Sequence, residues 1–230
     1  HGADHGWAVW LLPHLGEAPL RAGYDARKDW RDKANQKVRE VPLAVFRCPS
    51  VPLEGERLLS TSEAGFGTVK AAASDYTLMV GLHDGGKPLA DAGLIDRPKR
   101  PQSMLTANAR VRADDVTDGL GTTLMAVEMA GAPQLWQDGR MTDAGGGDEN
   151  AWAGAKAYIV LHGYDQTGTK TPGPRHTNAM NSHEIYSFHR GGAVHVFGDG
   201  SVHFVREAMD VRAFAALITR ANDDHAPPLE

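Results

Sequence analysis

The chain has 230 residues, enough for one domain with a sizeable core, and 24 basic against 29 acidic residues give a net charge of −5. Without a basic surplus to neutralise phosphates, nucleic acid is not an expected partner. No apolar run approaches the roughly 20 residues that span a bilayer. The only cysteine, Cys48, excludes a disulfide within the chain. It is either a buried thiol or one half of a bond whose partner lies upstream, and in this chain we predict it to be unpaired and at least partly accessible.

The first third predicts short helices followed by the start of a sheet. Trp7, Trp10, Leu11 and Leu15 recur at the spacing of one helix face, but Pro13 and Pro19 interrupt the pattern. The start of the chain is therefore predicted to form two short helices. The polar stretch 29–41 predicts a surface helix. Segments 43–46 and 73–82 predict a short and a longer strand.

The middle of the chain predicts surface loops around one strand. Segments 83–102 and 143–150 have the glycine-rich, charged composition of loops outside the core. The apolar segment 122–129 predicts a strand in which Glu128 must be paired, with Arg220 or His189 as the candidate partner.

Three aspartates precede that strand and allow two interpretations. Asp114, Asp115 and Asp118 can cap a short turn of helix, which we expect, or can supply oxygen ligands to calcium. Their spacing lacks the regular alternation of a dedicated calcium loop.

The last third predicts a β-hairpin followed by a helix. Segments 184–189, 193–197 and 201–205 predict strands, the last two joined by the turn Gly198-Asp199-Gly200. A three-residue turn with Gly200 at positive φ pairs Val194 with Phe204, Val196 with Val202 and His195 with His203. One face is then wholly apolar, and we predict that this face is buried beneath a helix capped by Asp210, whose apolar residues are Val211, Phe214, Leu217 and Ile218.

The 11 histidines raise the possibility of a metal site. Opposed across the hairpin, His195 and His203 would place Cβ atoms about 5 Å apart, close enough to share copper or zinc. Their mutual repulsion predicts that at least one has a lowered pKa. If His1 is a free terminus, its amine and imidazole could chelate copper. Solvated histidines without metal are the alternative.

A motif near the C-terminus points to a family. His189, nine intervening residues and Asp199-Gly200 form an H-x(9)-D-G pattern. Other landmarks follow one another in order: Trp7 with Leu11-Leu12-Pro13-His14-Leu15, Phe46-Arg47-Cys48-Pro49-Ser50, Ser74-Asp75-Tyr76, Val116-Thr117-Asp118-Gly119, Thr123-Leu124-Met125 with Glu128, and Leu217-Ile218-Thr219-Arg220. On these residues the chain resembles a planctomycete family of uncharacterised exported proteins with prepilin-like N-termini.

The resemblance implies a single α+β domain over residues 1–228, an antiparallel sheet packed on short helices like a pilin or pseudopilin head. Residues 229–230 are predicted to be vector-derived. Family members begin with a prepilin-type leader and a long apolar helix, which this chain lacks, so it resembles the soluble head alone. The resemblance also implies export to the cell surface or periplasm, where that helix anchors the protein. Through the same helix the protein would bind subunits of its own kind and contact the membrane. Relatives carry cysteines just before residue 184, where this chain has none.

The predicted function is therefore a non-enzymatic structural or interaction protein without a cofactor. No G-x-S-x-G, H-E-x-x-H, C-x-x-C or phosphate-binding loop is present, and no catalytic residue is predicted. Structural roles are predicted for the family-motif residues His189, Asp199 and Gly200. The alternative is a secreted copper- or zinc-binding protein or metalloenzyme that uses His1 or the pair His195 and His203.

Overall fold

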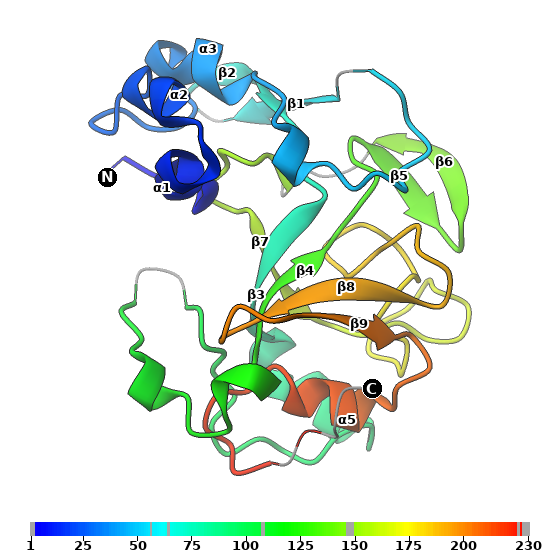
Figure 1. Cartoon of the computed structure of the whole chain (residues 1–230). Coiled ribbons are helices and arrows are strands. Elements are labelled where there is room, and N and C mark those ends of the chain that lie inside the picture. The colour runs from blue at the N-terminus through cyan, green and yellow to red at the C-terminus, as the bar shows by residue number, and fades with distance from the viewer. Residues whose placement is uncertain are drawn as a thin grey trace.

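A five-stranded sheet runs through the middle of the molecule (Figure 1). The strands lie in the order β7 (Tyr158–Leu161), β3 (Tyr76–Leu82), β4 (Leu124–Glu128), β8 (Gly192–Phe197) and β9 (Val202–Arg206). All neighbours are antiparallel except β3 and β7, which are parallel. The computed structural model describes residues 3–55, 57–63, 65–106, 109–145, 150–224 and 226. The predicted α+β class and mainly antiparallel sheet are confirmed.

Short elements surround this sheet. At one end lie the N-terminal helices and the hairpin β1–β2 (Figure 1): α1 (Ala8–Leu11), η1 (Leu12–Leu15), α2 (Ala18–Ala22), η2 (Lys33–Asn35), α3 (Gln36–Arg39), η3 (Ala44–Phe46), β1 (Leu58–Glu63) and β2 (Gly67–Ala72). The remaining elements are η4 (His83–Gly86), α4 (Lys87–Asp91), η5 (Ala113–Asp115), η6 (Leu120–Thr122), the hairpin β5 (Gln134–Gln137) and β6 (Arg140–Gly145), and α5 (Val211–Ala216). Among the described residues, no helix has the length and hydrophobicity to cross a membrane.

The hairpin of β8 and β9 has the predicted register. Val194 pairs with Phe204, His195 with His203 and Val196 with Val202. The amide of Phe197 donates to the carbonyl of Ser201 at 2.9 Å, and Gly200 has a φ of +85°, as a three-residue turn requires.

The burial of the two hairpin faces is the reverse of the prediction. Val202 and Phe204 are 59% and 42% exposed, whereas His195 and Phe197 are fully buried. Helix α5 packs on the histidine face, where the ring of Phe214 lies 5.9 Å from that of His195. Burial, followed by the charge of His176, lowers the pKa of His195 to about 3. A neutral imidazole packs like an aromatic ring, so this face can enter the core without an ionised group.

Helix α5 begins at the predicted cap but ends at Ala216, so Leu217 and Ile218 follow it rather than belong to it. Asp210 caps it by accepting hydrogen bonds from the amides of Arg212 and Ala213. Val211 and Phe214 of the helix join the core cluster beneath the sheet, together with Leu217 and Ile218 just after it, and all four are buried. The amide of Leu124 donates to the carbonyl of Leu217 at 2.7 Å, which ties the end of this helix to β4.

Several local predictions are wrong. Segment 43–46 forms the 3₁₀ helix η3 instead of a strand, and 184–189 makes only isolated bridges. Segment 83–102 contributes Leu89 and Ile95 to the core. In the first helices Trp10 and Leu11 are exposed, while Ala8, Val9 and Leu12 are buried. In these short elements tertiary packing, not the largest apolar side chains, selects the buried face.

Candidate functional site

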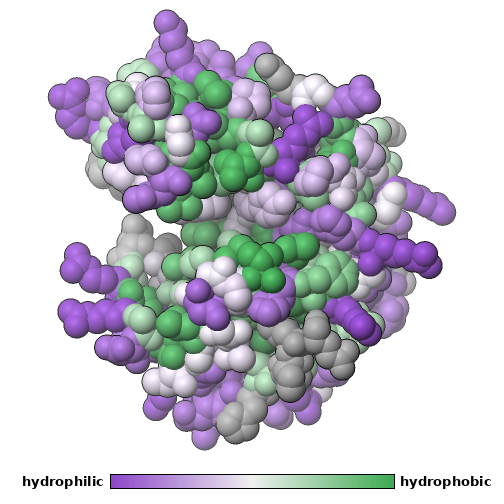
Figure 2. All heavy atoms as spheres, in the orientation of Figure 1, coloured by the Kyte–Doolittle hydropathy of each residue, from purple (hydrophilic) through white to green (hydrophobic). Residues whose placement is uncertain are grey.

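The middle of the sheet's second face is apolar, and none of the described helices packs on it. Its middle row crosses all five strands through paired residues: Tyr158, Leu78, Ala126, Val196 and Val202. Each of these side chains is half-buried or exposed. In Figure 2, hydrophobic residues gather over the middle of the molecule, where β8 and β9 lie in Figure 1. We call these residues, with Val194 and Phe204, the open face.

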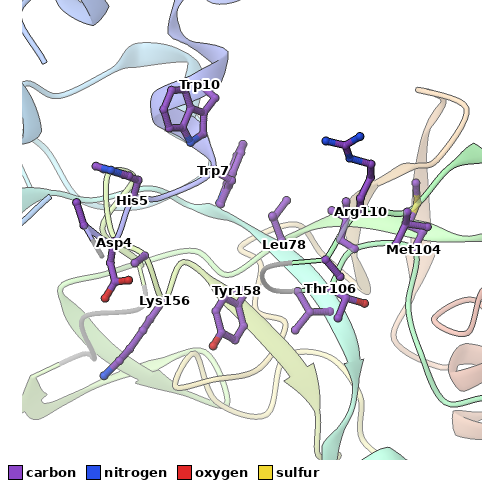
Figure 3. A pocket seen from close by; sticks show the side chains of 16 residues that line it. Asp4, His5, Trp7, Trp10, Leu78, Met104, Thr106, Arg110, Lys156 and Tyr158 are labelled. Carbon is purple, nitrogen blue, oxygen red and sulfur yellow. The ribbon is translucent and has the colours of Figure 1, made fainter. Parts of the chain in front are cut away.

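One end of the open face forms the floor of a cleft of about 740 Å³. Leu78 and Val80 of β3 and Tyr158 of β7 line it from the sheet. The opposite wall comes from the start of the chain, including Asp4, His5, Trp7 and Trp10, and a third side from residues 104–106 and 109–111 (Figure 3). The first described residues therefore border the open face directly.

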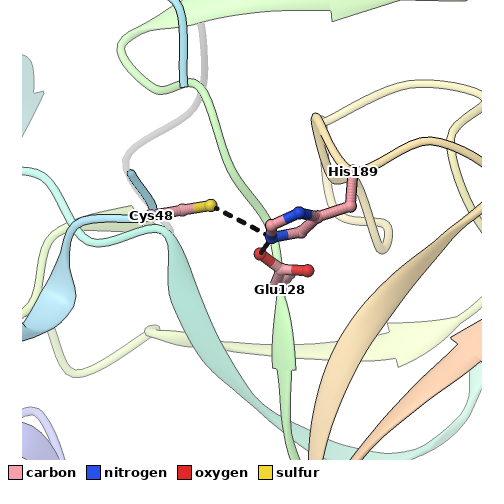
Figure 4. A group of neighbouring side chains, drawn as sticks. All are labelled: Cys48, Glu128 and His189. Carbon is pink, nitrogen blue, oxygen red and sulfur yellow. Dashed lines mark hydrogen bonds and ion pairs between the residues drawn. The ribbon is translucent and has the colours of Figure 1, made fainter. Parts of the chain in front are cut away.

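The next row of the same face runs into a polar cluster. Tyr76 pairs with Glu128 at the end of β3 and β4. The Glu128 carboxylate is fully buried because two loops, carrying Cys48 and His189, cover it (Figure 4). His189 Nε2 lies 3.5 Å from Cys48 Sγ and 3.4 Å from Glu128 Oε1. The predicted partner His189 is thus the one found, whereas Arg220 donates to the carbonyl of Ser103 at 2.9 Å.

The surroundings hold each member of this cluster in place. Glu128 Oε2 accepts a hydrogen bond from the amide of Val194 at 2.7 Å. Ser50 Oγ lies 3.3 Å from His189 Nδ1. When Ser50 accepts from Nδ1–H, the tautomer leaves Nε2 with its lone pair pointing at the thiol and carboxylate.

The loop of Cys48 is anchored by a buried ion pair. Asp75 accepts the amide of Cys48 at 2.8 Å and that of Gly131 at 3.0 Å. The guanidinium of Arg57 binds both carboxylate oxygens of Asp75, at 2.7 and 2.6 Å. Arg57 and the two amides all donate to the Asp75 carboxylate, which therefore fixes the position of the backbone beside the Cys48 thiol.

Cys48 is less accessible than the sequence suggested. We predicted partial accessibility, but the residue is fully buried. Burial, with the charges of Glu128 and Asp75 adding to it, raises the pKa of the Cys48 thiol. Burial and then the neighbouring Cys48 and Glu128 likewise raise the pKa of Tyr76. Without a cation, the cluster therefore favours a protonated thiol, which is a poor nucleophile.

The other predicted site residues lie apart from this cluster. Asp199 and Gly200 form the hairpin turn, where Asp199 accepts from the amide of Ser201 at 2.8 Å. His203 Nε2 lies 3.0 Å from Ser201 Oγ. The lowered pKa expected for one histidine of the pair is found at His195, but its causes are burial and His176 instead of His203. His1 lies outside the described residues.

Two of the three aspartates that were candidate calcium ligands accept hydrogen bonds from backbone amides. Asp115 accepts from the amide of Arg112 at 2.8 Å, and Asp118 from that of Asn222 at 2.7 Å. Capping is thus confirmed for Asp115, whereas Asp118 binds the backbone of the C-terminal segment instead.

A family match now accompanies this geometry. The family model described as "Protein of unknown function (DUF1559)" matches residues 1–212. The chain belongs to the DUF1559 family. No curated protein matched the chain, and no solved structure did. The range matched by the DUF1559 model includes the open face and the cluster of Cys48, Glu128 and His189, because all of these residues precede position 213.

The sequence offered His189 as one of two candidate partners of Glu128, but it did not place Cys48 beside them. Cys48, Asp75, Glu128 and His189 are all landmarks of the motifs quoted above. Cys48 and His189 are 141 positions apart, so no spacing rule links them. Their shared membership in the landmark motifs was the available signal.

Proposed function

We propose that this DUF1559 chain is the head of an exported pilin-like protein with a structural or interaction role. In this proposal an apolar helix, encoded upstream of His1, packs on the open face and anchors the head at the cell surface. Subunits of the same kind would assemble through this helix, as in pilins. A prepilin-type leader would direct the export.

The exposed apolar face is the observation that carries the proposal. Proteins rarely leave a contiguous apolar patch uncovered unless a partner surface packs on it. Here the patch is the middle row of a sheet face, with Val194 and Phe204 beside it, while α5 already covers the sheet's other face. A sheet needs both faces covered or one face polar, and the residues of the open face are not polar.

The course of the chain favours an N-terminal segment as the covering element. The residues from Ala3 to Trp10 border the cleft above Leu78 and Tyr158 (Figure 3). A helix arriving from upstream of His1 would therefore start beside the open face. Its apolar side chains would bury Val202 and Phe204, the most exposed hydrophobic residues of the face.

Cysteine labelling tests this packing in the longer protein. The gene segment upstream of His1 is expressed together with the head, and Val202→Cys is labelled with a thiol reagent in the long and short forms. Cys48 is buried and leaves little background. The matched control is Met141→Cys, because Met141 is 57% exposed against 59% for Val202 and lies on a different sheet.

We expect the upstream segment to slow labelling at position 202 at least tenfold and to leave position 141 unchanged. Equal labelling rates in both forms, or an upstream segment without an apolar helix, would refute the proposal. Metal binding at His1 or at His195 and His203 stays a prediction, since no contact between the described residues favours it.

A further inference from the structure

We propose that Cys48, Glu128 and His189 form a zinc-binding site. The site is independent of the helix that would cover the open face, and it differs from the histidine pair of the hairpin. It combines a thiolate, a carboxylate and an imidazole, each of which binds Zn²⁺ in proteins.

The distances between the donor atoms fit a zinc tetrahedron. With Zn–S of about 2.3 Å and Zn–N and Zn–O of about 2.1 Å, a tetrahedral angle places sulfur and nitrogen about 3.6 Å apart and nitrogen and oxygen about 3.4 Å apart. The measured separations are 3.5 Å from Cys48 Sγ to His189 Nε2 and 3.4 Å from His189 Nε2 to Glu128 Oε1. All three atoms lie within 4.8 Å of one another, so a small shift brings them around one ion.

Glu128 supplies a second, independent observation. Its Oε1 atom is buried and has no hydrogen-bond partner among the described residues, although it points into the cluster (Figure 4). The 3.4 Å contact with His189 is close enough for an ion pair but does not make a hydrogen bond. A buried carboxylate oxygen without a partner is costly, and a cation would satisfy it.

The remaining contacts resemble the support that bound zinc requires. Ligating residues are normally held by outer hydrogen bonds. Here Glu128 Oε2 accepts from the amide of Val194 and His189 Nδ1 faces Ser50 Oγ, while the amide of Cys48 donates to Asp75. These contacts leave the three inner atoms free for the ion.

Charge and access also suit a divalent ion. A thiolate and a carboxylate together neutralise Zn²⁺, so the loaded cluster adds no net charge to a buried place. The His189 side chain is 33% exposed, which provides an entry path and leaves a fourth position for water. Zinc has no redox chemistry of its own, so it is compatible with the thiolate.

Metal titration of chelator-treated protein tests the site. We expect one equivalent of Zn²⁺ to bind, measured by calorimetry or by competition with a zinc indicator. Near-isosteric variants Cys48→Ser and Glu128→Gln, and also His189→Gln, should each weaken binding at least about 100-fold. The matched control is His203→Gln, which alters the histidine pair and should leave the affinity unchanged.

Cobalt provides a readout that needs no variant. Co²⁺ bound to a thiolate gives an intense charge-transfer band in the near ultraviolet, and Cys48 is the only possible source in this chain. We expect the band to appear with one equivalent of Co²⁺ and to vanish when Zn²⁺ is added. The absence of binding, binding without the band, or loss of binding in His203→Gln would each overturn the proposal.

Discussion

Replacing Asp75 by asparagine should strongly destabilise the protein. Each carboxylate oxygen of Asp75 accepts two hydrogen bonds, one from Arg57 and one from a backbone amide. An asparagine keeps only one oxygen, so two donors would face its amide nitrogen. At about 1.5–3 kcal/mol for each hydrogen bond to a charged group, the loss is about 3–6 kcal/mol. Leaving the buried Arg57 without its counter-charge gives a similar figure of about 3–5 kcal/mol.

Chemical denaturation of wild type and Asp75→Asn measures this loss. The control is Asp91→Asn, which removes the exposed partner of Lys87 and Arg97 in two ion pairs screened by water. We expect its free energy of unfolding to stay close to that of wild type. If Asp75→Asn unfolds at nearly the same denaturant concentration as the control, the anchoring role of Asp75 is wrong.

Three further outcomes are expected. Phe214→Ala should lower the free energy of unfolding by about 3–5 kcal/mol in a denaturant titration, since the ring is fully buried and stacks on His176 at 4.0 Å; a loss below about 1 kcal/mol would contradict the docking of α5. Because the folded pKa of His195 is lowered to about 3, stability should fall as pH drops below about 6.5, by about 1.4 kcal/mol per pH unit for this residue. His195→Phe should reduce the slope by this amount in denaturation curves at pH 7, 6 and 5, leaving the contribution of His176, whose pKa burial lowers to about 4, and an unchanged slope would exclude His195 as the cause. Metal-free Cys48 should react with a thiol reagent only after unfolding, and rapid reaction of the native protein would disprove its burial.

The register of the hairpin could be predicted because it depends on local chemistry. A glycine at positive φ and the alternation of side chains set the pairing of Val194 with Phe204. The cap of α5 at Asp210 is equally local. The ion-pair partner of Glu128 was predicted to be Arg220 or His189, because a buried carboxylate needs a cationic partner, and His189 is the one found.

The buried side of the hairpin could not be predicted in the same way. Hydrophobicity favoured the face of Val202 and Phe204, yet α5 packs on the face of His195. A histidine is counted as polar in a pattern, but burial keeps its imidazole neutral. Which face α5 covers depends on the packing of the whole domain.

The sequence by itself therefore determined the hairpin pairing and the cap of α5, since each follows from short-range periodicity or turn chemistry, while the α+β class was implied by the family resemblance. Only the tertiary structure decided that Cys48 and His189 meet over Glu128. Residues so far apart in the chain come together through the packing of loops on a strand end. Loop packing is governed by contacts such as that between Asp75 and the Cys48 amide, which no local pattern encodes.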